Sequence, residues 1–359
     1  MNIIRIQSEY ERSQGIYYEY DRDGSLLGEG GMGRIYQGFR VSEHGRNSVA
    51  IKEIHENIAR DPQLIERAMR EASIQIDHEN LLRMYGFIPN VEYDPVHNAN
   101  ITRYYMVMER LVGVNLDQIF NGVTYDRSGM VIPYAQELYT LYSSNQRTEA
   151  IIKIMKGVLS GIMALHEKGF IHRDIDPSNV MITIDNKIKL IDYGVCKQIN
   201  TLTQEKHLTQ AGSFIGKVSY AAPELALGDV AHQNRTTDIY ALGVLIYYMA
   251  VGRLPFVGSN QDVLAAHVSQ KMPVNDIPNK GLRRIVEKAT QKRQEKRYAS
   301  AAEMIVDLEH VNPSVSSSGG TTKGVSMVQD PESTNTILLW VVAALCGFIL
   351  GVVVKFITM

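Results

Sequence analysis

The stretch FIHRDIDPSNVMIT, residues 170–183, decides the fold of this chain. It places Asp174, Asp176 and Asn179 within six residues, directly before the short apolar run VMITI, which has the pattern of a strand. A carboxylate can accept a proton, and carboxylate and amide oxygens are ligands that suit Mg²⁺. The stretch is therefore a candidate catalytic loop, and its chemistry depends on the segments around it.

A glycine-rich segment lies upstream, where GEGGMGRIYQG carries the pattern G-x-G-x-x-G at Gly28, Gly30 and Gly33. Glycine lets a backbone approach phosphates closely, but the pattern also fits a hairpin turn or a dinucleotide-binding fingerprint. That fingerprint requires a helix directly after the glycines, whereas RIYQGF has the pattern of a strand. Lys52 follows, seventeen residues after Ile35, as the one charge within the apolar run VAIK. A strand lysine is usually solvated, but after such a loop it is a candidate phosphate ligand.

The order of these motifs resembles that of the eukaryotic-type (Hanks-type) Ser/Thr protein kinases, from about Tyr18 to Leu308. His172-Arg173-Asp174 matches H-R-D, Asp192-Tyr193-Gly194 stands where D-F-G is usual, after the expected strand KIKLI, and Ala222-Pro223-Glu224 matches A-P-E. The form G-x-G-G-M-G-x-I-Y is similar to the bacterial branch. The resemblance implies an α+β fold with a β-rich N-lobe and a helical C-lobe, and ATP and Mg²⁺ as cofactors.

The resemblance also implies roles for individual residues. Asp174 would accept the proton of the substrate hydroxyl, and Asn179 and Asp192 would bind Mg²⁺. Apolar residues recur at helical spacing in ENIARDPQLIERAMREASIQI, residues 56–76, which predicts a helix after Lys52. Lys52 would hold the α- and β-phosphates with a glutamate partner on this helix, for which Glu71 is the first candidate and Glu66 the alternative. These two glutamates lie about 140° apart around a helix, so both cannot face Lys52.

Further positions follow from the same resemblance. Arg173 would hold a phosphorylated residue of the activation segment, Asp238 would support the catalytic loop, and Glu224 would form a buried pair with Arg297. For the apolar members of the ATP site, a core role is an equally good interpretation. The residues implied to surround ATP are Leu27, Gly28, Glu29, Gly30, Gly31, Met32, Gly33, Ile35, Ala50, Lys52, Met108, Glu109, Leu111 and Met181. Among them, the backbone from Glu109 to Leu111 would bond the adenine edge.

Two positions depart from the family pattern together. The lysine expected two residues after the catalytic aspartate is Asp176, and the threonine expected before A-P-E is Lys217. We expect Lys217 to reach Asp176 and to supply the missing charge near the transferred phosphate. The alternatives are a solvated Lys217 beside a tolerated Asp176, and, for the whole chain, a nucleotide-binding pseudokinase or scaffold without catalysis.

The composition limits the other partners. The 359 residues hold 37 Lys and Arg against 39 Asp and Glu, which gives no reason to expect nucleic acid, and protein substrates remain the expected partners. Two cysteines, Cys196 and Cys346, predict no disulfide framework, and the N-terminus has no signal-peptide pattern. We expect an N-lobe over 1–111, a C-lobe over 112–312, a Ser- and Gly-rich linker over 313–335 and a transmembrane helix over 336–355.

The last of these expectations rests on ILLWVVAALCGFILGVVV, residues 337–354, which contains no charged residue. A helix needs about 20 apolar residues to cross a bilayer. A buried core helix is the alternative, but core helices normally keep a polar face. The span predicts a single-pass protein of the cell membrane with its kinase domain in the cytoplasm. Ala343, Gly347 and Gly351 recur every fourth residue, a spacing that can pack two helices into a homodimer or can arise by chance.

Two segments are left open. The activation segment offers several hydroxyls for phosphorylation, and the sequence cannot choose among Thr201, Thr203, Thr209 and Ser213. The stretch 121–148 has the character of an insertion early in the C-lobe, and the sequence assigns it no role.

Overall fold

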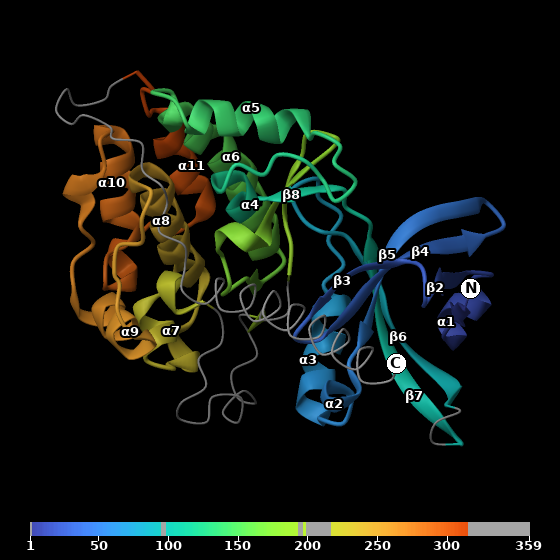
Figure 1. Cartoon of the computed structure of the whole chain (residues 1–359). Helices are drawn as coiled ribbons and strands as arrows, with labels where there is room; N and C mark the ends of the chain where they lie inside the picture. Colours follow the sequence, from blue (N-terminus) through green and yellow to red (C-terminus); the bar gives the residue numbers. More distant parts are fainter. Residues whose placement is uncertain (1, 95–97, 193–196, 199–216, 315–359) are drawn as a thin grey trace, which may run out of the picture. The chain divides into compact units, whose positions relative to one another are not determined.

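Seven strands form the antiparallel sheet that carries the glycine-rich segment in this computed structural model (Figure 1). The strand order is β1-β2-β4-β5-β7-β6, and β3 pairs with β4. The structure describes residues 2–94, 98–192, 197–198 and 217–314, without the side chains of Gln63, Arg67, Glu71, Lys197 and Gln198. The strands are β1 Ile3–Ile6, β2 Tyr17–Asp21, β3 Leu26–Gly30, β4 Gly33–Ser42, β5 Gly45–Ile54, β6 Met84–Asp94 and β7 Ala99–Glu109.

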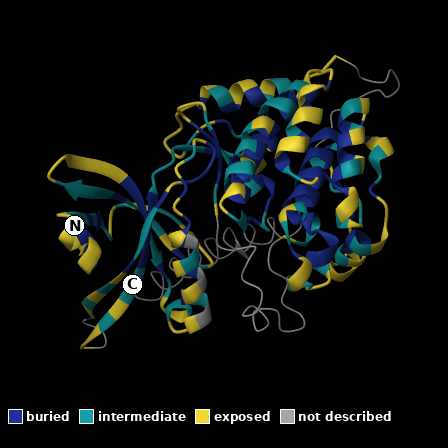
Figure 2. Cartoon of the chain, turned by 180° about the vertical axis from the view of Figure 1, so that it is seen from behind, coloured by how far each residue is buried: buried dark blue, intermediate teal, exposed yellow. Residues whose placement is uncertain are grey.

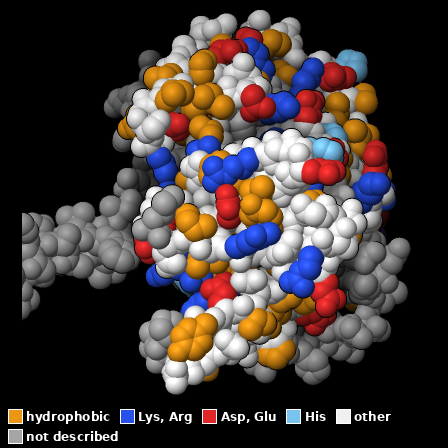
Figure 3. All heavy atoms as spheres, turned by 90° about the vertical axis from the view of Figure 1, so that its right-hand side faces the viewer, with side chains coloured by type: hydrophobic (Ala, Val, Ile, Leu, Met, Phe, Trp, Pro, Cys, Tyr) orange, Lys and Arg blue, Asp and Glu red, His pale blue; other side chains and the backbone are white. Residues whose placement is uncertain are grey.

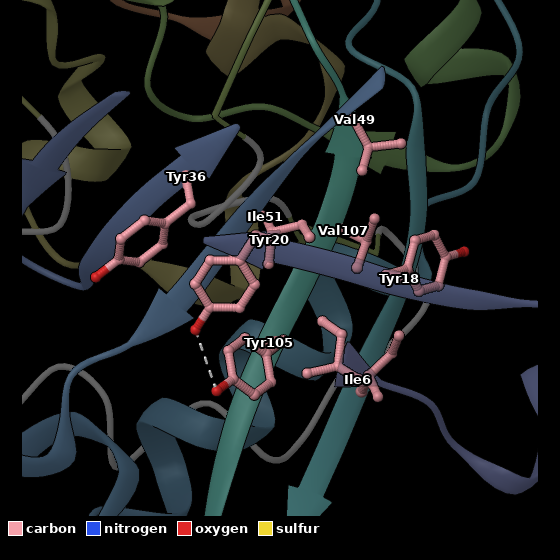
Figure 4. Packing of buried hydrophobic residues seen from close by; sticks show 9 residues of the cluster. Ile6, Tyr18, Tyr20, Tyr36, Val49, Ile51, Tyr105 and Val107 are labelled. Carbon is pink, nitrogen blue, oxygen red and sulfur yellow. Dashed lines mark hydrogen bonds between the residues drawn. The ribbon is translucent and has the colours of Figure 1, made fainter. Parts of the chain in front are cut away.

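The alternation along β5 divides its residues between two faces of this sheet. Val49 and Ile51 belong to a buried cluster on one face, drawn in Figure 4. Ala50 and Lys52 alternate with them and so belong to the opposite face, as the candidate nucleotide site requires. Within the cluster Tyr20 Oη lies 3.4 Å from Tyr105 Oη. The cluster consists of Ile6, Tyr18, Tyr20, Tyr36, Val49, Ile51, Ile88, Tyr105 and Val107.

The helical stretch after β5 is divided, where the sequence indicated one helix over 56–76. The structure has a short α2, Glu56–Ala59, and then α3, Pro62–Ser73. Proline fits the first position of a helix but lacks the N–H that a continuing helix would need, so Pro62 starts a new helix. β1 and the short α1, Glu9–Ser13, were not expected from the sequence. The expectation of one continuous helix was wrong.

The C-lobe is mainly helical, and α8, Arg235–Val251, is buried along most of its length. Figure 2 shows exposed residues on the outward faces of the helices and buried residues between them. The other helices are α4 Leu116–Phe120, α5 Pro133–Tyr142, α6 Arg147–Glu167, α7 Pro223–Ala226, α9 Asn260–Ser269, α10 Lys280–Ala289 and α11 Ala301–Glu309, with short 3₁₀ turns at η1 Pro177–Asn179, η3 Val218–Tyr220, η4 Val230–His232, η5 Val274–Asp276 and η6 Gln294–Lys296.

Five short strands hold the candidate catalytic loop within the C-lobe. β10 pairs antiparallel with both β8 and β11, and β9 pairs with β12. The predicted strands VMITI and KIKLI are therefore present and neighbouring. Their bounds are β8 Gly113–Asn115, β9 Phe170–Ile171, β10 Val180–Thr183, β11 Ile188–Leu190 and β12 Lys197–Gln198. The expected β-rich N-lobe and helical C-lobe are confirmed.

The expected membrane helix over 336–355 lies outside the described residues, as does most of the expected linker. Within the ranges that the structure describes, no helix has the length and apolar character needed to span a bilayer. Figure 3 shows basic and acidic side chains interspersed over the face that it draws, so no broad surface of one sign covers that face.

Candidate active site

The glycine-rich segment forms a strand, a tight turn and a second strand. Gly30 and Gly33 face each other across the turn between β3 and β4. A side chain at Gly33 would collide with the backbone oxygen of Glu53, so this close approach of β4 to β5 requires glycine. His55 supports the turn, because its N–H donates to Met32 O at 3.0 Å. The glycine-rich segment is therefore a hairpin turn between two strands and not the start of a helix.

Lys52 lies on β5, where it is opposite Ile35 on one neighbouring strand and Met106 on the other. Glu71 belongs to α3, but its side chain is outside the described residues, so the Lys52–Glu71 pair stays a prediction. The alternative partner, Glu66, is 67% exposed and pairs with Arg70 at 3.2 Å. This contact directs Glu66 along its own helix and leaves Glu71 as the better candidate.

The segment 109–112 joins the two lobes. Met108 and Ala50 are buried opposite each other on β7 and β5, whereas Leu27, Ile35 and Met181 are partly exposed. The N–H of Glu109 donates to Arg83 O at 2.9 Å, which excludes this N–H as a donor to a base. Of the expected backbone contacts to adenine, the Glu109 N–H is therefore unavailable and Leu111 remains a prediction.

The candidate catalytic loop brings Asp174 and Asn179 into direct contact. Asn179 Nδ2 donates to Asp174 Oδ2 at 3.0 Å and to Asp174 O at 2.9 Å. The backbone N–H of Lys217 donates to Asp174 Oδ1 at 3.1 Å. Burial and the neighbouring carboxylate of Asp176 raise the pKa of Asp174 above its ordinary value. Asp174 is thus an oriented carboxylate whose affinity for a proton is increased.

Lys217 lies beside Asp176, which is the contact expected from the sequence. Its Nζ is 3.1 Å from Asp176 Oδ1 and 3.2 Å from Ser178 Oγ. Asp176 is 1% exposed and also accepts from the backbone and side chain of Ser178, each at 2.6 Å. Lys217 is 48% exposed. Although burial opposes it, the carboxylate of Asp176 raises the pKa of Lys217, so the ammonium stays charged beside the loop.

Asp238 on α8 holds the backbone from which Asp174 projects. Its two carboxylate oxygens accept from the N–H groups of His172 and Arg173, each at 2.8 Å. His166 Nε2 lies 2.7 Å from the same carboxylate. Burial alone would raise the pKa of Asp238, but His166 and these donors lower it. Arg173 has a φ of 68°, a backbone conformation that side chains disfavour, and the Asp238 contacts stabilise it.

Asn179 and Asp192 are the donors that the resemblance implies for Mg²⁺. The N–H of Ile191 donates to Asn179 O at 2.9 Å, so the two residues project from adjoining backbone. Asn179 uses Nδ2 as a donor, which leaves Oδ1 for a cation. No group of three His, Cys, Asp or Glu side chains is placed as a metal site within the described ranges. One amide and one carboxylate nevertheless fit Mg²⁺, which commonly takes few protein ligands together with substrate phosphates.

Glu224 and Arg297 form a buried pair below the end of the activation segment. Arg297 Nη1 lies 2.8 Å from Glu224 Oε1, and Nη2 lies 3.0 Å from Oε2. Thr237 Oγ1 also donates to this carboxylate, at 2.8 Å. The contact is the one that the resemblance implied. Tyr193, Gly194 and the hydroxyls Thr201, Thr203, Thr209 and Ser213 lie outside the described residues.

Some residues near the site were not singled out from the sequence. Lys189 on β11 is buried and donates to Glu109 Oε1 at 2.6 Å and to Leu81 O at 3.0 Å. It links the strand that leads to Asp192 with the segment joining the lobes. KIKLI carries two lysines, Lys187 and Lys189, so the signal that marked Lys52, a lone charge in an apolar strand, does not distinguish Lys189 in the sequence.

The segment 217–220 rests on a buried histidine, which makes stability depend on pH. His267 Nε2 is 2.9 Å from Ser219 O, and burial lowers the pKa of His267 to about 4. An unfolded histidine takes up its proton near pH 6.5. Protonation of the unfolded chain therefore lowers the free energy of unfolding by on the order of 3 kcal/mol as the pH falls from 6.5 to 4. We expect His267→Gln to remove this share of the acid sensitivity, as followed by urea unfolding midpoints at several pH values.

A matched control is His44→Gln, because the side chain of His44 is 85% exposed. This control is expected to keep the pH dependence of the unmodified chain. If the urea midpoints of His267→Gln and the unmodified chain changed with pH in the same way, His267 would not be a source of the acid sensitivity.

Comparisons with known proteins agree with this geometry. Residues 22–314 match the family model described as "Protein kinase domain". The chain is 29% identical over 289 residues to the probable serine/threonine-protein kinase PknB of Lactococcus lactis, covering 79% of this chain and 40% of that protein. It is 28% identical over 296 residues to the serine/threonine-protein kinase PknB of Mycobacterium leprae, covering 80% and 42% respectively. The chain thus spans less than half the length of these relatives. Since the family model extends over most of the sequence, the chain belongs to the protein kinase family.

Proposed function

We propose that this chain transfers the γ-phosphoryl group of ATP to Ser or Thr hydroxyls of proteins. The observation that carries the proposal is the joining of Asp174, Asn179 and Lys217 in one hydrogen-bonded group at the catalytic loop. The hydroxyl oxygen would attack the γ-phosphorus, the bond to the β–γ bridging oxygen would break, and the hydroxyl proton would pass to Asp174. Mg²⁺, bound by Asn179 and Asp192, would neutralise charge on the phosphates.

The direct test is phosphotransfer by the full-length chain with Mg²⁺ and ATP on a generic protein acceptor. Mass spectrometry of the acceptor is expected to find phosphoserine or phosphothreonine, and Lys52→Met is expected to reduce the yield strongly. If the unmodified chain binds ATP but transfers no phosphate, it is a pseudokinase instead.

We further propose that the chain is anchored in the cell membrane through residues 337–354 with the kinase domain in the cytoplasm. The support is the uninterrupted apolar character of this segment. Expression of the full-length chain, followed by carbonate extraction of membranes, tests the anchor. Release of the chain into the soluble fraction would exclude it.

The pairing of Lys217 with Asp176 gives a prediction about the catalytic charge. We expect Lys217→Thr to lower kcat about 10²-fold at saturating ATP, because one cationic donor to the developing charge is lost. The double variant Asp176→Lys with Lys217→Thr returns the lysine and the threonine to their usual family positions. It is expected to recover part of the lost activity, although residue 176 then no longer accepts the hydrogen bond from Ser178 N.

Steady-state kinetics with ATP and a peptide acceptor measure both variants. Lys271→Thr is the matched control, because Lys271 is exposed and follows α9. An unchanged kcat in Lys217→Thr would show that the ammonium has no part in phosphotransfer.

A further inference from the structure

The insertion carries an arginine to the first glycine of the glycine-rich segment. A methyl group built on Gly28 would lie 3.2 Å from Nη2 of Arg127 and 3.6 Å from Nη1. Gly28 belongs to β3 of the N-lobe, whereas Arg127 lies between α4 and α5 of the C-lobe. The guanidinium therefore lies against the strand that would cover the nucleotide.

The backbone on both sides of Arg127 is held by a local network centred on Asp126. The carboxylate oxygen Oδ1 of Asp126 accepts from Ser128 N at 2.9 Å, Ser128 Oγ at 2.6 Å and Met130 N at 2.9 Å. The N–H of Asp126 donates to Met130 O at 2.8 Å, and that of Ile132 donates to Thr124 O at 2.8 Å. The hydroxyl and N–H of Ser128 lower the pKa of Asp126, so its carboxylate stays ionised and keeps accepting these bonds. The loop is thus ordered where it presents Arg127.

The guanidinium of Arg127 is available to a ligand. Within the part of the chain that the structure describes, no hydrogen bond or ion pair engages it, and the residue is exposed. Arg22 differs, because its guanidinium lies 2.9 Å from Glu92 and 3.3 Å from Glu53. An arginine offers five N–H donors in a fixed plane. At Arg127 these donors lie beside a nucleotide-binding strand without a protein acceptor.

We propose that Arg127 is an additional ATP-binding residue, which hydrogen-bonds the ribose–phosphate part of the nucleotide. This inference rests on the proposed function. Gly28 lies opposite Ile35, before the turn at Gly30 and Gly33 where the backbone would approach the phosphates. A donor at Gly28 is therefore closest to the portion of ATP that joins the base to the phosphates. Ribose hydroxyls and phosphate oxygens both accept hydrogen bonds from a guanidinium.

Equilibrium binding of ATP to the full-length chain in the presence of Mg²⁺ tests the proposal. Arg127→Ala is expected to weaken binding about tenfold, the effect of losing a charged hydrogen bond. The ATP affinity of Arg127→Lys is expected to lie between those of the unmodified chain and Arg127→Ala, because an ammonium keeps the charge but not the planar pair of donors. Arg293→Ala is the matched control, since Arg293 is 71% exposed in the C-lobe, and its affinity is expected to stay unchanged.

A second ligand identifies the contacted group. If Arg127 binds the ribose, Arg127→Ala weakens the binding of ATP but not that of 2′,3′-dideoxy-ATP. If Arg127 binds phosphate, the variant weakens the binding of both nucleotides equally and leaves the binding of adenosine unchanged. ATP binding as tight as that of the unmodified chain overturns the proposal, and a raised KM for the protein acceptor would then assign Arg127 to that substrate. Failure of the unmodified chain to bind any nucleotide would overturn the proposed function as well.

Discussion

Replacing Asp174 by Asn is expected to lower kcat by about 10²–10⁴, the usual contribution of a positioned general base. The expectation follows from the contacts of the carboxylate, which accepts from Lys217 N at 3.1 Å and from Asn179 Nδ2 at 3.0 Å. These bonds direct Asp174, while burial and Asp176 raise its pKa and strengthen it as a base. Asparagine keeps the shape of the side chain but cannot accept the proton.

Steady-state kinetics and ATP binding, measured on the same full-length preparation, separate chemistry from affinity. The ATP dissociation constant is expected to change little, because Asp174 has no implied contact with the base or ribose. Asp185→Asn is the matched control, since Asp185 is 59% exposed in the turn after β10. Retention of normal kcat in Asp174→Asn would show that another group accepts the proton.

Replacing Arg297 by Met is expected to lower the free energy of unfolding by about 3–5 kcal/mol, the usual effect of removing one partner from a buried ion pair. Glu224 would remain buried without the guanidinium that now makes two bonds to it at 2.8 and 3.0 Å. Arg297 also donates to Thr236 O at 2.9 Å and Lys292 O at 3.0 Å, and these carbonyls would lose their donor. The substitution therefore removes both charge pairing and hydrogen bonds.

Urea unfolding of the full-length chain measures the loss. Arg253→Met is the matched control, because the exposed Arg253–Asp276 pair at 2.8 Å should contribute no more than about 1 kcal/mol. Burial opposes ionisation of Glu224, but Arg297 lowers its pKa below the ordinary value. The pair thus stabilises the fold above the unfolded pKa of Glu224, and this contribution is lost as the pH falls through the lower folded pKa. Equal losses for Arg297→Met and Arg253→Met would contradict the buried-pair interpretation.

Much of the candidate site could be predicted from short sequence patterns, because its parts are local. Asp174, Asp176 and Asn179 lie in one loop, and the strands and helices beside them, β10, β11, α6 and α8, are marked in the sequence by apolar residues. The division of α2 from α3 was missed even though Pro62 was visible. The apolar spacing continues across the break, and periodicity alone does not show where a helix restarts.

Contacts between distant segments are different, because a sequence pattern carries no distance. Lys189 and Glu109, 80 positions apart, meet at 2.6 Å only because β11 packs beside the segment joining the lobes. Arg127 was part of an insertion without a role until folding placed it beside Gly28. The sequence by itself determined the family and the lobes and supplied the candidate catalytic groups, since these rest on residue type and spacing. Only the tertiary structure decided which charges meet, because side chains distant in the chain are brought together by packing.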